Sequence, residues 1–180
     1  GIPMLFQGQE FSASSPFLYF ADFKDDLAHG VSSGRRTFLA QFPSLASEDT
    51  QARLADPADL ETFRRPQLDR SESERHVQAY ALHRDLLALR RDDPVIGKRP
   101  CHAEGAAISE TSWLVRYAEK TGQDRLLIVN LGLDLRLAPI AEPLLAPVAG
   151  HSWRLLWSSE DARYGGSGVP LPGEDGVWNG

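Results

Sequence analysis

The spacing of the apolar residues changes near Pro94, and this change most constrains how the chain can fold. Residues 71–91 begin with Ser71 and Glu74 at the spacing of a capping box and continue with a broad apolar face. This pattern predicts one long helix, which Pro94 ends. After Pro94 the apolar residues fall in short segments separated by glycine and proline, as is typical of an antiparallel sheet. The predicted strands are 106–109, 113–117, 125–131, 133–137 and 153–157.

The sequence therefore predicts an α/β part followed by an all-β part. The boundary is expected between residues 92 and 104, where proline and glycine cluster. We expect one domain over residues 1–93 and a second domain, a C-terminal antiparallel β-sandwich, over residues 94–180.

An apolar run, Ile2–Phe6, opens the chain without a cap, a turn or a polar lead-in. Such a run is typical of a strand buried on both faces of a parallel sheet. Val177 and Trp178 look like the start of another strand, so we expect a piece of a longer protein, cut within a strand at both ends. Its 180 residues are too few for a (β/α)8 barrel, which needs roughly 250. An unpaired strand over residues 1–7 would also favour self-association of the fragment.

Shorter elements are predicted from caps and turns. Ser32 or Ser33 could cap a helix that runs to about Phe42. Asp56-Pro57 together with Asp59 predicts a one-turn helix. The glycine-rich stretch 165–168 lacks the lysine and the following helix of a phosphate-binding loop, so it is interpreted as a plain turn.

Composition excludes several classes of protein. The chain has 25 acidic and 19 basic residues, a formal net charge of −6, which argues against a nucleic-acid-binding protein. No apolar run approaches the ~20 residues needed to cross a bilayer, so no membrane partner is expected. The one cysteine, Cys101, rules out an internal disulfide and fits a reducing compartment such as the cytoplasm.

Acidic and aromatic residues near the first predicted strand are candidates for chemistry on sugars. Four carboxylates occur there, and glycoside hydrolysis by retention needs two carboxylates about 5–5.5 Å apart. Loop capping and solvated surface charge are the alternative roles. These residues are Glu10, Asp22, Asp25 and Asp26. Phe11 and Phe17 could stack on the apolar faces of sugar rings, or they could pack around the loop.

The histidines indicate no metal site. His76 and His83 are seven residues apart on the predicted long helix, whereas a zinc pair on one helix is usually four apart. Cys101-His102 has no second motif to complete a catalytic pair. We therefore interpret these histidines as structural and expect neither a metal nor a cofactor.

The residues also resemble a known family. Residues 1–11 with 15–17 resemble the eighth barrel strand and following loop of α-amylase-type enzymes (glycoside hydrolase family 13). The more specific part resembles the malto-oligosyltrehalose trehalohydrolase family. Its motifs are residues 19–23, 34–38, 56–57, 62–63, 67–69, 157–161 and 163–166, and helix 71–91 resembles the last barrel helix of that family.

This resemblance implies the last β/α unit of a (β/α)8 TIM barrel followed by the family's β-domain. It implies a retaining hydrolase that cleaves the α-1,4 bond next to the trehalosyl end of maltooligosyl trehalose and releases trehalose. The catalytic Asp, Glu and Asp would lie upstream of Gly1, so no residue of this chain is expected to be catalytic, and the 180 residues alone should be inactive. The predicted substrate-binding residues are Gln9, Glu10, Phe11 and Phe17.

Three positions depart from the family pattern. Gln9 stands where glutamate is common, Phe23 where histidine is common and Arg70 where tryptophan is common. Two alternatives remain open: another enzyme of the superfamily, such as a glycogen branching enzyme, or a non-catalytic β-domain that binds α-glucan or supports the barrel.

Overall fold

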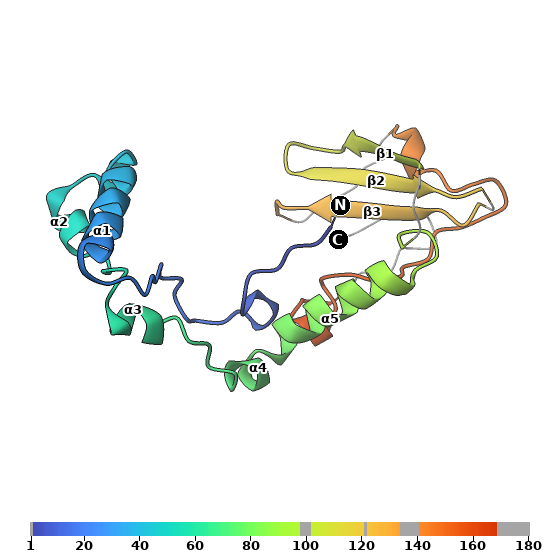
Figure 1. Cartoon of the computed structure of the whole chain (residues 1–180). Helices are drawn as coiled ribbons and strands as arrows, with labels where there is room; N and C mark the ends of the chain where they lie inside the picture. The colour runs from blue at the N-terminus through green and yellow to red at the C-terminus, as the bar shows by residue number, and fades with distance from the viewer. Residues whose placement is uncertain (1, 98–101, 121, 134–140, 169–180) are drawn as a thin grey trace. The chain divides into compact units, whose positions relative to one another are not determined.

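The computed structural model describes residues 2–97, 102–120, 122–133 and 141–168 (Figure 1). The chain forms two compact units, Gly1–His76 and Val77–Gly180. The first unit contains the helices α1 to α4, joined by long irregular segments. The second contains the helix α5 and the strands β1 to β3 (Figure 1).

The first unit contains six short elements. They are the 3₁₀ turns η1 (Gln9–Phe11) and η2 (Pro43–Leu45) and the helices α1 (Asp25–Leu39), α2 (Glu48–Ala52), α3 (Leu60–Arg64) and α4 (Glu72–Arg75). The prediction that residues 2–6 form a strand is wrong, because they lie outside every strand of the described chain. A buried strand needs neighbours that satisfy its backbone groups, and the described strands are all in the second unit.

The helix α1 begins earlier than expected, at Asp25 rather than near Ser32. Two carboxylates, those of Asp25 and Asp26, lie in its first turn, where they interact favourably with the positive end of the helix dipole. The helix ends at Leu39, and the ring of Phe38 then packs against that of Phe42 with 5.8 Å between centroids.

The short helix predicted from Asp56-Pro57 and Asp59 is found as α3, and Asp59 is its N-cap. The Asp59 carboxylate accepts the N–H of Glu61 at 2.9 Å and begins α3 there, so Pro57 precedes the helix. Thr62 of α3 is buried and donates its hydroxyl to the carbonyl of Asp56 at 2.6 Å. This bond holds the helix against the turn that precedes it.

The single helix predicted over 71–91 is interrupted at His76, whose φ of −107° and ψ of 43° are not helical. The predicted capping box is also wrong. The hydroxyl of Ser71 donates to the Asp69 carboxylate at 2.7 Å instead of capping α4. The second part, α5 (Val77–Asp92), ends before Pro94 as predicted. Beyond it, Asp93 accepts the N–H groups of the next turn.

The second unit is built around three antiparallel strands in the order β1-β2-β3: β1 (His102–Ala107), β2 (Ser112–Ala118) and β3 (Arg125–Asn130). In the register, Leu114 of β2 lies between Ala106 and Ile128. Leu114 is fully buried, while Trp113 on the opposite face is 39% exposed. The core of this unit therefore lies on the Leu114 face.

Arg116 of β2 fastens a loop to the Leu114 face. Its guanidinium pairs with Asp124 at 2.8 Å and donates to the carbonyl of Ala146 at 2.7 Å. It also lies over the ring of Trp153, 5.4 Å from the centroid. These contacts hold the 3₁₀ turn η3 (Pro143–Leu145) and residue 153 near the sheet.

Two further contacts connect α5 with the rest of the second unit. Asp93, just beyond the helix, pairs with Arg125 of β3 at 2.9 Å. The hydroxyl of Tyr164, in the 3₁₀ turn η4 (Ala162–Tyr164), donates to Asp85 of α5 at 2.8 Å.

The β-sandwich is not seen: the described residues form one three-stranded sheet. Segments 106–109, 113–117 and 125–131 overlap strands as predicted, but 153–157 has no strand. There the indole N–H of Trp153 donates to the carbonyl of Leu145 and that of Trp157 to the hydroxyl of Tyr164, so the tryptophans anchor an irregular segment. Positions 134–137 and 177–178 lie outside the described residues, and the barrel unit is likewise not seen. The glycine-rich turn is confirmed.

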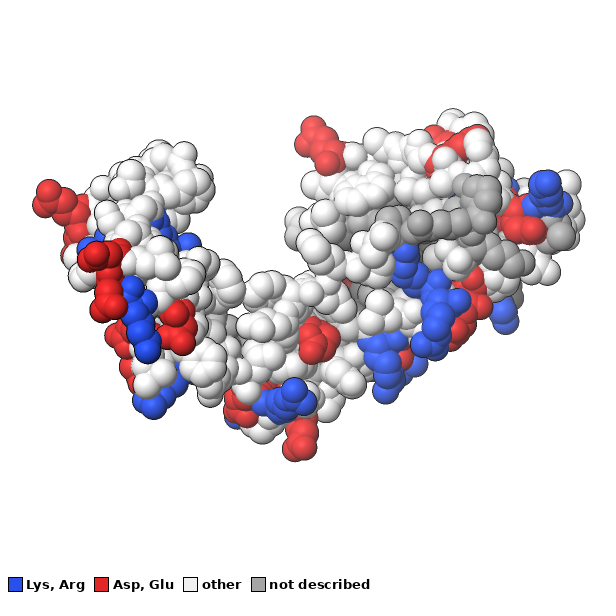
Figure 2. All heavy atoms as spheres, in the orientation of Figure 1, with Lys and Arg blue, Asp and Glu red and all other residues white. Residues whose placement is uncertain are grey.

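Side chains of both signs lie next to one another on the face seen in Figure 2. Many are paired within one helix, as Arg53 with Asp49 in the region of α2 and Arg64 with Glu61 in α3. None of the described helices combines the length and the apolar character needed to cross a membrane.

Candidate functional site

The predicted substrate-binding residues lie in one compact loop, residues 8–17, which we call the anchored loop. It turns at Gly8, with φ of 79°, continues through η1 and leaves it at Ser12, with φ of 52°. The N–H of Ala13 donates back to the carbonyl of Gly8 at 2.9 Å. A Cβ on Gly8 would lie 2.6 Å from the Cβ of Ala13, so both the backbone and the packing require glycine here.

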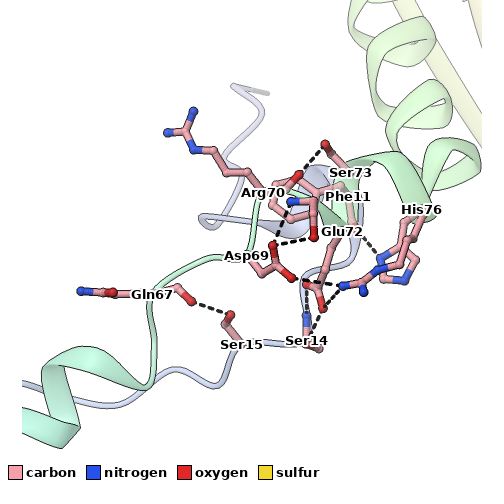
Figure 3. A network of polar contacts seen from close by, with 11 residues as sticks. Phe11, Ser14, Ser15, Gln67, Asp69, Arg70, Glu72, Ser73 and His76 are labelled. Carbon is pink, nitrogen blue, oxygen red and sulfur yellow. Dashed lines mark hydrogen bonds and ion pairs between the residues drawn. The ribbon is translucent and has the colours of Figure 1, made fainter.

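A buried carboxylate, Glu72 at the start of α4, holds the anchored loop in place (Figure 3). It accepts the backbone N–H of Ser14 at 2.9 Å and the hydroxyl of Ser14 at 2.6 Å. Hydrogen bonds to a charged acceptor are shorter and stronger than neutral ones. Glu72 therefore replaces the water that this part of the loop would otherwise bind.

Arg75 and Asp69 complete the charge balance around Glu72. The Arg75 guanidinium lies 3.4 Å from the Glu72 carboxylate and 3.2 Å from that of Asp69. Asp69 in turn accepts both the N–H and the hydroxyl of Ser71. One cation thus faces two carboxylates, and local donors compensate for the remaining negative charge.

These contacts also lower the pKa values of the two carboxyl groups. The side-chain and backbone hydrogen bonds from Ser14 and then the Arg75 charge lower the pKa of Glu72. The hydrogen bonds from Ser71 and the charge of Arg75 do the same for the pKa of Asp69. Both groups are therefore ionised at neutral pH, as anchoring acceptors rather than proton donors.

Two more contacts hold the anchored loop at other points. The ring nitrogen Nδ1 of His76 lies 2.8 Å from the carbonyl of Phe11, so it carries the proton and donates. The hydroxyl of Ser15 donates to the carbonyl of Gln67 at 2.9 Å. The loop is thereby fixed to the segment 67–76 at three places, residues 11, 14 and 15 (Figure 3).

The four predicted residues all lie in this loop, but their side chains differ in exposure to solvent. Gln9 is exposed and its side-chain oxygen accepts the N–H of Phe6 at 3.1 Å. Glu10 is half-buried. Phe17 is 65% exposed and meets Phe6 edge to face, with 5.3 Å between centroids, whereas Phe11 is only 6% exposed. Gln9, Glu10 and Phe17 are thus more accessible than Phe11, and contact of substrate with any of the four stays a prediction.

The other candidates take part in local structure. Asp25 and Asp26 lie in the first turn of α1, where their charges interact favourably with the helix dipole. His83 bonds to the carbonyl of Ala79 within α5, and His102 pairs with Glu104 in β1. Over the described ranges, no three His, Cys, Asp or Glu side chains are grouped to hold a metal ion.

Sequence reasoning missed the anchors of the loop. Glu72 was hidden by the apparent capping box of its neighbours, and its partner is 58 residues away. His76 was recognised as structural, which the structure confirms, although its contact with Phe11 was not foreseen. The available signal was the group of serines at residues 12–15, whose backbone and hydroxyl donors require acceptors from another part of the chain.

The region that contains the sheet matches a known protein family. Residues 102–178, which include β1, β2 and β3, match a family described as "Domain of unknown function (DUF3459)".

The curated relatives of the chain carry one name. The chain is 36% identical over 149 residues to a malto-oligosyltrehalose trehalohydrolase of Deinococcus radiodurans, a match covering 81% of this chain and 24% of the relative. It is 33% identical over 164 residues to the enzyme of that name from Mycobacterium tuberculosis, covering 87% of this chain and 24% of the relative. The chain is thus a relative of the malto-oligosyltrehalose trehalohydrolases, as its sequence motifs indicated, and it spans about a quarter of their length.

Proposed function

We propose that this chain is part of an α-amylase-type glycoside hydrolase that releases trehalose from maltooligosyl trehalose. The enzyme would cleave the α-1,4 bond next to the trehalosyl end with retention of configuration. The observation that carries this proposal is the 36% identity to a malto-oligosyltrehalose trehalohydrolase over 81% of the chain. Retention needs two carboxylates on opposite sides of the scissile bond.

Within that enzyme, residues 1–93 would contribute the last β/α unit of a (β/α)8 barrel and residues 94–180 a β-domain. The catalytic carboxylates would lie outside these 180 residues. The match covers only about a quarter of each relative, which supports placing the catalytic carboxylates in the other three quarters. The reaction requires no metal or cofactor, and the single cysteine of this chain suits the cytoplasm.

The anchored loop would form one wall of the substrate cleft. Active sites of such barrels lie at the C-terminal ends of the strands and are built from the loops that follow them. Gln9, Glu10 and Phe17 would then face sugar, and Phe11 would support them from below. The three contacts of the loop with residues 67, 72 and 76 support this role, because a wall of a binding site must keep its shape.

A second candidate function concerns residues 102–178 alone. These residues match a family whose description does not mention trehalohydrolases. This β-domain could bind α-glucan or simply support the barrel. A third possibility is a different superfamily activity, such as the branching of glycogen.

Trehalose release from maltooligosyl trehalose by the full-length protein tests the proposal directly. We expect free trehalose together with a shortened malto-oligosaccharide. New α-1,6 linkages in amylose without trehalose would indicate a branching enzyme and overturn the proposal. The purified 180-residue chain should release none, and clear turnover by it would contradict the placement of the catalytic carboxylates outside it.

A further inference from the structure

A pocket of about 260 Å³ lies within the first unit, beside the anchored loop. One side is formed by residues that precede or follow that loop, and the other by α3 and the segment after it. The residues used below are Gln7, Leu18, Phe20, Phe63, Gln67 and Leu68. Pockets for drug-sized ligands are ~300–1,000 Å³, so this pocket suits a single ring-sized group.

The pocket combines flat apolar surface with neutral polar groups. The rings of Phe20 and Phe63 lie 5.2 Å apart at an angle of 49°, and Phe63 is 49% exposed. Leu18 and Leu68 extend the apolar surface. None of the lining residues carries a charge, which disfavours phosphate, a carboxylate or a metal ion as the ligand.

Two side-chain amides supply hydrogen-bonding groups at this pocket. Within the described chain, neither Gln7 nor Gln67 uses its side-chain amide in a hydrogen bond to protein. Each amide can donate two hydrogen bonds and accept two. By contrast, the hydroxyl of Thr62 is already bonded to the Asp56 carbonyl at 2.6 Å. The two glutamines are thus the groups free to bind a ligand.

The segments that line the pocket adjoin the contacts that fix the anchored loop. The backbone of Gln67 accepts the hydroxyl of Ser15 at 2.9 Å, while its side chain extends away from that contact (Figure 3). The bonds between Glu72 and Ser14 fix the preceding residue of the loop. A preformed pocket loses less entropy when a ligand binds.

From these features we infer that the pocket is a binding site for one neutral pyranose ring, an α-glucosyl unit of a malto-oligosaccharide. A pyranose has an apolar C–H face for the rings of Phe20 and Phe63 and hydroxyl groups for the amides of Gln7 and Gln67. In the proposed enzyme this unit would belong to the glucan part of the substrate, so the assignment to substrate rests on the proposed function, whereas the binding of a pyranose does not.

Calorimetric titration of the full-length protein with maltotriose tests this inference. The variants are Gln7→Leu and Gln67→Leu, which keep the side-chain size and remove the amide. Gln41→Leu is the matched control, because Gln41 is exposed and lies outside the pocket. Trehalose and the open-chain polyol sorbitol are the comparison ligands; sorbitol has hydroxyl groups but no ring face.

We expect each pocket variant to weaken maltotriose binding by roughly threefold to tenfold, the equivalent of one lost neutral hydrogen bond. Gln41→Leu should leave it unchanged, and sorbitol should not bind. Tighter binding of trehalose than of maltotriose at this pocket would overturn its assignment to the glucan part of the substrate. Unchanged maltotriose affinity in both pocket variants would overturn the inference.

Catalytic assays separate this inference from the proposed function. In an active trehalohydrolase, the pocket variants should raise KM for maltooligosyl trehalose with little change in kcat, because this contact is made equally in ground and transition states. If the wild-type protein releases no trehalose but its maltotriose affinity still depends on Gln67, the proposed function fails and the pocket stands. If trehalose is released and neither variant changes KM or affinity, the pocket fails and the function stands.

Discussion

The carboxylate of Glu72 accepts both the N–H and the hydroxyl of Ser14, 58 residues earlier in the chain, at 2.9 and 2.6 Å. One buried side chain thus replaces the neighbours that a strand or helix would give this loop. The anchored loop has little regular structure of its own, so its shape depends on side chains from residues 67–76. Its stability can therefore be tested by single substitutions.

Glu72→Gln should loosen the anchored loop. The substitution keeps the size of the side chain but replaces one acceptor oxygen by a donor and removes the charge that pairs with Arg75. We expect faster amide hydrogen exchange over residues 8–16 of the full-length protein and unchanged exchange in α1. Glu74→Gln is the control, because Glu74 is an exposed residue of the same helix. Equal protection of residue 14 in wild type and Glu72→Gln would show that Glu72 is not the anchor.

Gly8→Ala should destabilise the fold by about 1–3 kcal/mol, because alanine is strained at a φ of 79° and its Cβ would lie 2.6 Å from that of Ala13. Urea denaturation of the full-length protein measures the change in the free energy of unfolding. Gly30→Ala is the matched control: Gly30 lies inside α1 with no atom within 4 Å of its Cβ position. It should be neutral or stabilise by ~0.5–1 kcal/mol. Equal effects of the two substitutions would contradict the requirement for glycine at position 8.

The ion pair of Asp93 and Arg125 should make stability depend on pH. Burial acts to raise the pKa of Asp93, but the hydrogen bonds from the Ile96 N–H, Arg125 and the Val95 N–H outweigh it and leave the pKa below its ordinary value of 3.8. A lowered carboxyl pKa stabilises the folded state above the unfolded value, and this contribution disappears as the pH falls through the folded value. We therefore expect the unfolding free energy to fall as the pH drops below about 4.

Asp93→Asn tests this assignment, because asparagine keeps the shape of the side chain but does not titrate. The variant should be less stable than wild type at pH 7 and should lose less stability between pH 5 and pH 3. Urea unfolding across that range gives both slopes. Parallel curves for the two proteins would assign the acid sensitivity to other carboxylates, such as Asp124, whose pKa is also lowered by its hydrogen bonds despite burial.

Arg116→Lys should destabilise the second unit although the charge is kept. The guanidinium bonds Asp124 and also the carbonyls of Leu144 and Ala146, and one ammonium group cannot reproduce this forked geometry. We expect a loss of about 1–3 kcal/mol in thermal unfolding, since the largely buried Asp124 carboxylate and the two carbonyls lose donors. Arg154→Lys is the control, because Arg154 is exposed. An equal shift in the two variants would mean that Arg116 acts only through its charge.

Local patterns predicted those elements that local interactions determine. Alternation and turn residues located the strands 112–118 and 125–130 to within a few residues, and Pro94 correctly marked the end of α5. The same reasoning failed for Ile2–Phe6 and for 153–157. An apolar run specifies only that a segment can be buried, and whether it becomes a strand depends on a neighbour at hydrogen-bonding distance.

The sequence placed the four candidate residues in one loop, which the structure shows, while their contact with substrate stays a prediction. The resemblance identified the loop that carries Gln9, Glu10 and Phe17, but the sequence could not show that Phe11 turns inward. That orientation follows from the left-handed residues Gly8 and Ser12 on either side of η1. The residues that anchor the loop could not be predicted from the sequence. Contacts such as that of Ser14 with Glu72 join distant parts of the chain and leave no periodic pattern.

Gln67 divides its two roles between its main chain and its side chain. Its carbonyl accepts the Ser15 hydroxyl whatever side chain the residue carries, and its side-chain amide, at the pocket that the residue lines, is left for the inferred ligand. Replacing the side chain should therefore alter ligand preference without disturbing the loop, so ligand choice and structural integrity can vary independently at this position. Single substitutions at Gln67 are accordingly a route by which evolution or protein engineering could change the ligand preference of the pocket.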